Sequence, residues 1–323
     1  MRDDNTIIIG VHGLMNKNKD EIISKWWEAA ILEGLHKNCG IDININLKML
    51  YWADILHKYP LHNDARYYFD ELYNDEPYRN NLNQFFEPYS NSLHNKLKLA
   101  YQSIVRMTLD ITQHYERLSF WTTHKVFRDL AYYYNKKTFI LDRDGQKKNL
   151  RKILMGKLIQ ELKNHRDKKI MIIGHSMGAI ICYDVLRNIR SFIPNIEIEQ
   201  FITIGAPLSY AIVRKHQFLS LKDGHHRSKL RTPSAVKSWF NFSDPTDLAC
   251  YRTHLKPFYE PNHSGIEVMD QLVNNQYKVY NKKLNKVIKN THNPFGYLRC
   301  PEVSEKIRQY LGETLPNYKN TSQ

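Results

Sequence analysis

Short apolar runs that end at a glycine predict the main strands of this chain. The three clearest runs are 6–9 before Gly10, 169–173 before Gly174 and 201–204 before Gly205. Continuous apolar runs of this length are typical of strands buried on both faces of a sheet, and a glycine lets the backbone turn sharply where the strand ends. Two further strands are expected at 43–51, where apolar and polar residues alternate, and at 236–242.

Apolar residues at helical spacing separate these expected strands. The two clearest stripes are Ile22, Trp26, Ala30 and Ile31, and Met177, Ile180, Ile181, Val185 and Ile189. Alternation of strands with amphipathic helices predicts a mostly parallel sheet covered by helices on both faces, because parallel strands need crossover connections. The fold class expected from the sequence is therefore α/β.

One long stretch interrupts the alternation. It contains a single glycine, Gly145, and its apolar residues at helical spacing predict helices near 93–111 and 126–134. Two interpretations stay open: a cap over a substrate site, or a helical subdomain whose aromatic residues form only its own core. The expected parts of the chain are a core of residues 1–59 and 152–315, a helical insertion or cap at 60–151 and a flexible tail at 316–323.

Composition adds a positive charge to this picture. The chain has 323 residues, with Lys+Arg 47, Asp+Glu 33 and a formal net charge of +14. The basic residues are spread along the chain and no nucleic-acid module is recognisable, so we expect no specific nucleic-acid partner. Peripheral contact with an anionic membrane surface, or an acidic substrate, is equally compatible with the charge.

The sequence also indicates a compartment and the absence of cofactors. The apolar run near the N-terminus is about five residues long, shorter than the roughly 7–15 of an export signal. Cys39, Cys182, Cys250 and Cys300 lack the spacing of a zinc or redox site, which favours the reducing cytoplasm. No phosphate-binding glycine motif is present. Residues 223–226, Asp-Gly-His-His, are better explained as a charged turn than as metal ligands, so no metal or other cofactor is expected.

The sharpest chemical signal is Gly174-His175-Ser176-Met177-Gly178, between an expected strand and an expected helix. In a G-x-S-x-G element of this kind the serine occupies a strained turn, and the two glycines let neighbouring backbones approach. The following helix directs free N–H groups towards a developing oxyanion. Ser176 is therefore the expected nucleophile.

A serine nucleophile needs a base, and an acid that orients the base. In the arrangement that accompanies this motif the acid follows the serine in the chain and the histidine comes last. Asp244 and Asp247 both follow the strand expected at 236–242. We favour Asp247 by about two to one, because Asp244 precedes Pro245 in a sequence typical of an Asx turn.

Three histidines follow the acid: His254, His263 and His292. His292 is preferred because it lies in a loop just before a helix expected to begin near Pro301. His263 also lies in a loop and is the alternative base. For either residue, a solvated surface histidine is the competing interpretation.

The loop after the first strand, His12-Gly13-Leu14, is expected to complete an oxyanion hole. Gly13 lets the backbone bend so that the N–H of Leu14 points at the site, and the N–H of Met177 supplies the second donor. We expect His12 to be a structural histidine that is hydrogen-bonded within its loop.

Taken together, these segments resemble the α/β-hydrolase superfamily. The segments that carry the resemblance are His12-Gly13-Leu14, residues 174–178, Ile204-Gly205-Ala206-Pro207, the Asp-Pro-Thr-Asp-Leu-Ala sequence at 244–249 and the His292 loop. They are most similar to the lipase and esterase branch, including its inositol-deacylase-like and lecithin–cholesterol-acyltransferase-like groups. The resemblance spans roughly 5–55 and 150–313 and implies a Ser176, Asp247, His292 triad with Leu14 and Met177 as oxyanion donors. The membrane segments and export signal of several relatives are missing.

The expected function is hydrolysis of a carboxylic ester through an acyl-enzyme. The aromatic residues of the insertion favour an apolar acyl or alkyl group, so the expected partner is a small-molecule or lipid ester. An acyltransferase with the same triad and a non-catalytic binding protein on a hydrolase scaffold are the alternatives.

Overall fold

The structure is a computed structural model of the chain. It describes residues 5–61, 78, 86–93, 95, 97, 99–100, 130, 132–135, 137–141, 145–220, 229–281 and 286–312. The tail expected at 316–323, the segment 223–226 and most of the insertion lie outside the described residues.

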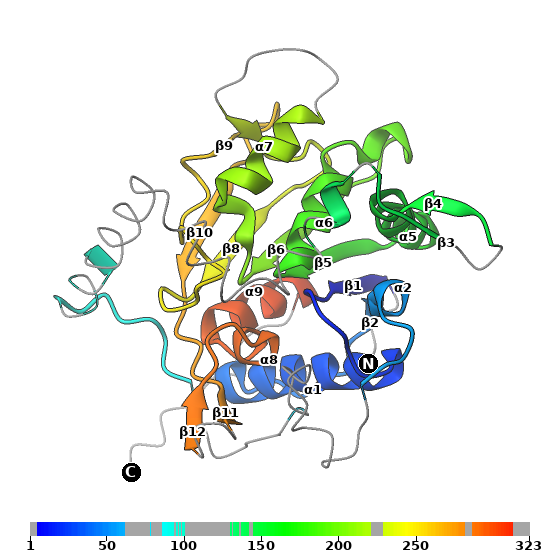
Figure 1. Cartoon of the computed structure of the whole chain (residues 1–323). Coiled ribbons are helices and arrows are strands. Elements are labelled where there is room, and N and C mark those ends of the chain that lie inside the picture. The colour runs from blue at the N-terminus through cyan, green and yellow to red at the C-terminus, as the bar shows by residue number, and fades with distance from the viewer. Residues whose placement is uncertain are drawn as a thin grey trace, which may run out of the picture.

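The central element is a 6-stranded sheet in which every neighbouring pair is parallel (Figure 1). Its spatial order is β10 (Val268–Leu272), β8 (Trp239–Ser243), β6 (Gln200–Ile204), β5 (Lys169–His175), β1 (Thr6–Val11) and β2 (Leu47–Leu50). The five predicted strands are all present, although β2 is shorter than 43–51, and β10 is an additional edge strand.

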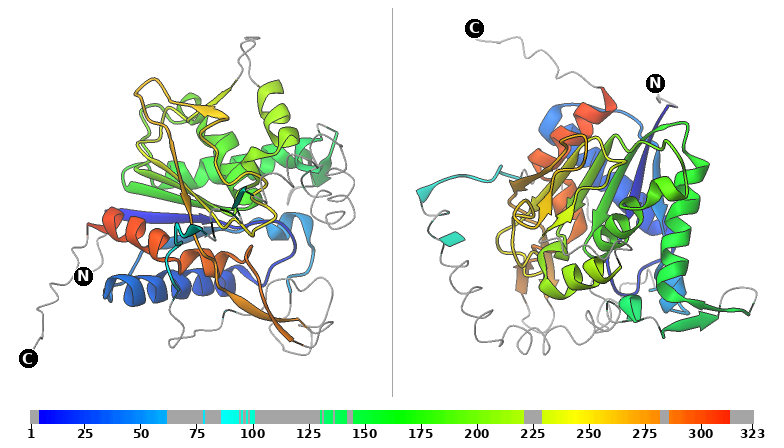
Figure 2. Two further views of the ribbon diagram at one scale, coloured as in Figure 1. Left: turned by 90° about the vertical axis from the view of Figure 1, so that its left-hand side faces the viewer. Right: turned by 90° about the horizontal axis from the view of Figure 1, so that it is seen from above.

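Helices cover both faces of the sheet, as Figures 1 and 2 show. On one face lie α1 (Asp20–Cys39), α8 (Pro294–Leu298) and α9 (Pro301–Leu311). The opposite face carries α5 (Leu150–Asn164), α6 (Met177–Leu186) and α7 (Ala211–Leu219). The predicted α/β-hydrolase type of fold, a mostly parallel sheet flanked by helices, is confirmed.

Shorter elements complete the described part of the chain. They are α2 (Ala53–Leu56), the 3-10 turns η2 (Ile189–Ser191) and η3 (Pro207–Ser209), and the strand pairs β3 (Phe139–Leu141) with β4 (Lys147–Asn149), β7 (Leu230–Arg231) with β9 (Tyr259–Glu260), and β11 (Lys278–Asn281) with β12 (Lys286–Lys289).

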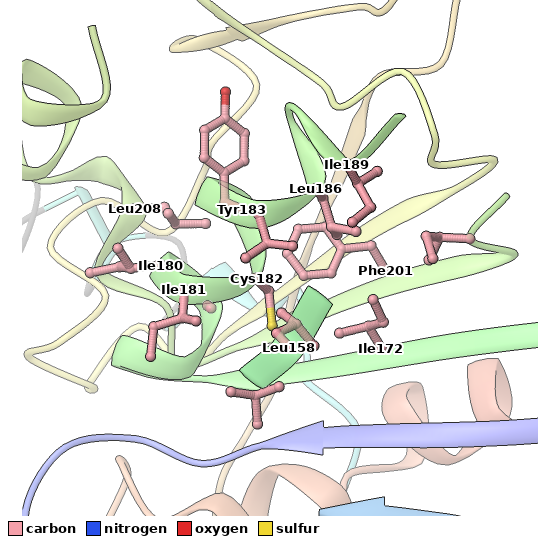
Figure 3. Packing of buried hydrophobic residues seen from close by; sticks show 14 of the residues in the cluster. Leu158, Ile172, Ile180, Ile181, Cys182, Tyr183, Leu186, Ile189, Phe201 and Leu208 are labelled. Atoms are coloured by element: carbon pink, nitrogen blue, oxygen red, sulfur yellow. The ribbon is translucent and has the colours of Figure 1, made fainter. Parts of the chain in front are cut away.

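Alternate residues of each buried strand supply the two cores. Ile7 and Ile9 of β1 face the α5 and α6 side, whereas Ile8 faces the α1 and α9 side. Figure 3 shows the first of these cores, where Cys182 of α6 lies beside Leu158 of α5 and near Ile172 and Phe201 of the sheet. A helix buried in this way fixes the position of its own first turn, and Ser176 immediately precedes α6.

The predicted stripe on α1 is confirmed at Ala30 and Ile31, and Trp26 packs against the same core, but the most buried residues near the start of the helix are each one position further on. Ile23 and Trp27 are buried, whereas Ile22 and Trp26 are only partly buried. Trp26 lies edge-on to Phe295 of α8 at 6.0 Å, because α1 contacts α8 as well as the sheet. A helix with two partners does not have a single apolar stripe.

The described residues of the insertion differ in part from the helical expectation. Residues 139–149 include an antiparallel hairpin, with Gly145 at φ +73° between its strands. Leu93 and Leu97 are 73% and 62% exposed, so the predicted stripe does not face a core there. Tyr133 and Tyr134, in contrast, are helical and buried against the core that α5 and α6 share.

No helix in the described part of the chain combines the length and the apolarity required to span a bilayer.

Candidate active site

Ser176 occupies a strained turn between β5 and α6. Its φ of 52° lies in the left-handed region that side-chain-bearing residues seldom adopt. A Cβ atom on Gly174 would lie 2.7 Å from Ala179 Cα, and one on Gly178 would collide with the carbonyl oxygen of Val11. Both glycines are therefore needed for the close approach of neighbouring backbones, as the motif predicts.

The side chains of Ser176, His292 and Asp247 form one hydrogen-bonded chain. The Oγ of Ser176 lies 3.1 Å from Nε2 of His292, and Nδ1 of the same ring lies 2.9 Å from Oδ2 of Asp247. When Ser176 donates its proton, Nε2 is the acceptor and Nδ1–H donates to the carboxylate. This arrangement can remove a proton from the serine hydroxyl and stabilise the resulting imidazolium.

Asp247 is fully buried and is held through both oxygens. Oδ1 accepts a hydrogen bond from the backbone N–H of Ala249 at 2.9 Å. Oδ2 accepts from Tyr297 Oη at 2.7 Å in addition to His292. A buried carboxylate that accepts hydrogen bonds at both oxygens is held in one orientation.

Asp244, the alternative acid, has a different environment. Its Oδ1 accepts from the N–H and the hydroxyl of Thr246 at 2.7 and 2.6 Å, which is the geometry of an Asx turn. Its Oδ2 accepts from the N–H of Asn275 at 2.7 Å. The described contacts of Asp244 therefore fix the loop that carries Asp247.

The alternative base, His263, is exposed and lies away from Ser176. Its Nε2 accepts from Nη1 of Arg231 at 2.9 Å. His254 is likewise engaged elsewhere, with Nδ1 at 2.9 Å from the hydroxyl of Thr253. His292 is the histidine that the structure brings to the serine.

Two residues fix the backbone around His292. Nδ2 of Asn275 donates to the carbonyl oxygens of Thr291 and Asn293, both at 2.9 Å. His175 donates from Nε2 to the carbonyl oxygen of His292 at 2.8 Å. Burial, and next the nearby His292, lower the pKa of His175 well below its ordinary value, so His175 is a neutral donor. No signal in the sequence marks Asn275 as part of the site.

The loop after β1 lies directly against the serine. A Cβ on Gly13 would be 2.8 Å from Ser176 Cβ and 2.9 Å from Nδ1 of His175. Met177 is the first residue of α6, so its N–H is among those that a helix start leaves without an intrahelical partner. The oxyanion roles of Leu14 and Met177 stay predictions.

His12 is hydrogen-bonded within this loop and stacks on Trp52 with ring centroids 4.8 Å apart. Its Nδ1–H donates to the carbonyl oxygen of Gly13 at 2.8 Å, and its Nε2 accepts from the N–H of Trp52 at 3.1 Å. Burial, with a smaller contribution from the charge of Lys17, lowers the pKa of His12 to about 3. These contacts are those of a structural histidine.

Gly205 lies beneath the acid and the base. It has φ +56°, and a Cβ there would be 3.1 Å from Asp247 Oδ2 and 3.2 Å from His292 Nδ1. From the sequence, Gly205 was expected only to end the strand at 201–204 and to belong to the segment Ile204-Gly205-Ala206-Pro207.

The described residues include no cluster of three or more His, Cys, Asp or Glu side chains that could hold a metal ion. Residues 223–226 fall outside that search.

The comparisons with known proteins give one family. Residues 141–225, roughly a quarter of the chain, match the family model described as lecithin:cholesterol acyltransferase. The matched segment includes β5, Ser176, α6 and Gly205 and ends before Asp247 and His292. A search of curated proteins gives no match. The family match and the fold together confirm the predicted similarity to the α/β-hydrolase superfamily.

Proposed function

We propose that this α/β-hydrolase-like chain is a serine enzyme that cleaves carboxylic esters through an acyl-enzyme intermediate. The observation that carries the proposal is the hydrogen-bonded chain from Ser176 through His292 to Asp247, at 3.1 and 2.9 Å. The family match supports an enzyme that transfers acyl groups or hydrolyses esters. The proposal adds that water is the acyl acceptor.

In the proposed reaction Ser176 Oγ attacks the ester carbonyl carbon while His292 Nε2 takes the hydroxyl proton. The carbonyl π bond opens to an oxyanion, which accepts hydrogen bonds from the N–H groups of Leu14 and Met177. The C–O bond to the alcohol then breaks, and His292 gives its proton to the leaving oxygen. A water molecule attacks the acyl-enzyme by the same steps and regenerates Ser176.

Exposed apolar side chains on the loop of Asp247 and on the neighbouring segment of α7 support an apolar acyl or alkyl group. Leu248, next to Asp247, is 75% exposed, and Ile212 in the first turn of α7 is 40% exposed. The hydroxyl of Tyr210 donates to the carbonyl oxygen of Leu248, and its ring lies 5.2 Å from that of Tyr251. Rates on p-nitrophenyl esters of increasing acyl length would test this, and a strict preference for acetate would contradict it.

Replacement of the nucleophile tests the central claim. Ser176→Ala should keep the fold and lose both ester turnover and labelling by a fluorophosphonate. Ser238→Ala is the matched control, because the hydroxyl of Ser238 donates to the backbone oxygen of Glu199, away from Ser176. Labelling retained by Ser176→Ala would refute the assignment, and the absence of labelling in the unaltered chain would favour a binding protein.

Acyl transfer is the second candidate, because the family model that matches is named for an acyltransferase. Both reactions share the acyl-enzyme and differ in the acceptor. Product analysis with one ester, in water alone and with an added long-chain alcohol, separates the two. A new ester that dominates over free acid would favour transfer.

We also propose that the β11–β12 hairpin makes peripheral contact with anionic lipid surfaces. The register places Lys278 opposite Lys289, Lys286 is exposed, and Val287 is 61% exposed. Exposed basic side chains beside an exposed apolar side chain suit the surface of an anionic membrane. Lys289 also contacts Asp244 at 3.6 Å, so Lys278 and Lys286 are the residues to change.

Vesicle sedimentation tests this contact. Binding should require anionic lipid, weaken with salt and decrease in the Lys278→Gln/Lys286→Gln variant, while hydrolysis of a soluble ester is unchanged. Lys152→Gln/Lys163→Gln, on exposed positions of α5, is the control of equal charge. An equal loss of vesicle binding in both variants would indicate an effect of net charge alone. Binding to RNA in a gel-shift assay, without binding to vesicles, would indicate a different partner.

A further inference from the structure

The hydroxyl group of Tyr297 bridges the two aspartates of the loop after β8. It lies 2.7 Å from Oδ2 of Asp247 and 3.0 Å from the backbone nitrogen of Asp244. Tyr297 is fully buried and belongs to α8, which begins two residues after His292. One short segment thus carries both the imidazole and a second group that contacts the carboxylate.

The direction of the two hydrogen bonds follows from the partners. The N–H of Asp244 can only donate, so the hydroxyl oxygen accepts there, and the single hydroxyl proton is available for Asp247. Burial, and next the charge of Asp247, raise the pKa of Tyr297 well above its ordinary value, so the hydroxyl keeps this proton. Cys250 is a weak further neighbour, with Sγ 3.6 Å from Oδ2.

We infer that Tyr297 is a positioning residue for the proposed reaction, which directs Oδ2 of Asp247 at Nδ1 of His292. This inference rests on the proposed function. The N–H of Ala249 holds Oδ1 and the Tyr297 hydroxyl holds Oδ2, so the carboxylate cannot rotate away from the imidazole. The hydrogen bond from Tyr297 also reduces the negative charge of Asp247 that the protonated His292 ring experiences.

Tyr297→Phe removes the hydroxyl and keeps the ring. His292 should then take up a proton more readily, because the charge of Asp247 is less offset, and the acid limb of the kcat/KM profile should move about half a unit to higher pH. We expect kcat to fall about tenfold with little change in KM, since hydrogen bonds to charged groups are the strong ones. The titratable groups around the pair, which the variant leaves in place, are Asp244, Cys250, His175 and Lys289.

Tyr259→Phe is the matched control. Tyr259 is also buried, and its hydroxyl contacts Leu208 and Gln217 instead of the acid. Both variants should lose comparable stability, but only Tyr297→Phe should move the acid limb. A fall in melting temperature with an unmoved profile would show a structural role alone and overturn the inference.

An NMR titration of the His292 ring separates this inference from the proposed function, because it needs no turnover. The signal is identified by its loss in His292→Asn, and it should titrate at higher pH in Tyr297→Phe than in the unaltered chain. An unmoved titration overturns the inference, even if Ser176 is the nucleophile. If the titration moves but no ester is cleaved, the contact stands and the proposed function fails.

Should Tyr297→Phe not fold, the unaltered chain still gives a test. The hydroxyl proton of Tyr297 should exchange slowly with solvent, and its NMR signal should move upfield in Asp247→Asn. A fast-exchanging proton overturns the inference.

Discussion

A single methyl group at position 205 should strongly lower the rate of ester cleavage with only a moderate loss of stability. Gly205 has φ +56°, and a Cβ there would lie 3.1 Å from Asp247 Oδ2, 3.1 Å from Tyr297 Cε2 and 3.2 Å from His292 Nδ1. Gly205→Ala therefore adds a backbone strain and also pushes on the acid and the base at once.

The backbone part of the effect is a stability cost. A left-handed conformation costs a residue with a side chain about 1–2 kcal/mol relative to glycine. The steric part falls on the reaction. Ordinary van der Waals contact begins near 3.4 Å, so the neighbours must shift by a few tenths of an ångström. Small displacements of catalytic groups are costly, and we expect kcat to fall by about tenfold to a hundredfold.

Gly265→Ala is the matched control for the backbone cost. Gly265 has φ +77°, and nothing lies within 4 Å of the position that its Cβ would occupy. Urea unfolding should give similar losses for the two variants, while ester hydrolysis should fall only in Gly205→Ala. Full activity of Gly205→Ala, or an equal loss of activity in Gly265→Ala, would refute the reasoning.

Three further predictions concern other buried groups. Asp247→Asn should lower kcat by about 10³–10⁴-fold, whereas Asp244→Asn should mainly lower the free energy of unfolding; steady-state kinetics and urea unfolding on both variants decide between the roles. His12 has a pKa of about 3 when folded and 6.5 as its ordinary value, so the unfolded chain binds more protons and stability falls as the pH drops from about 6.5 to 3. His12→Gln should reduce this slope by about 1.4 kcal/mol per pH unit, and an unchanged slope in urea unfolding would contradict the assignment. Arg151→Met leaves the fully buried Asp184 without its ion pair at 2.6 Å and should lower the free energy of unfolding by about 3 kcal/mol. Adding Asp184→Asn should recover part of this loss, and no recovery would mean that the guanidinium acts mainly through packing.

The sheet could be predicted because its strands are buried on both faces. β1, β5 and β6 are continuous apolar runs that few other structures would accommodate. β10, Val268–Leu272, was missed because it is an edge strand with only Val268 buried and with polar residues at 270 and 271. The hairpin within 139–149 was missed for a similar reason, since its strands are three residues each and exposed or partly buried where their burial is described.

The nucleophile turn could be predicted because its constraints are local. Gly174 makes room for Ala179 at the start of α6, and Gly178 makes room for Val11 at the end of β1; the helical and strand patterns of these two segments are themselves visible in the sequence. The residues that fix the acid and the base are different. Tyr297 and Asn275 act through contacts across 50 and 16 residues of chain, and neither belongs to a motif. Tertiary packing alone determines which tyrosine or asparagine reaches the site.

The two aspartates show how local turn chemistry and tertiary contact combine. Asp244 closes its turn on Thr246, and the N–H of Asp247 then donates to the carbonyl oxygen of Asp244 at 3.0 Å. The other oxygen of Asp244 accepts from Asn275, whose side chain in turn holds the backbone on either side of His292. A single hydrogen-bonded route therefore connects the loop of the acid with the loop of the base. Because both loops share this route, Asp244→Asn and Asn275→Ala should affect the distance between acid and base together, and their effects on kcat should be less than additive.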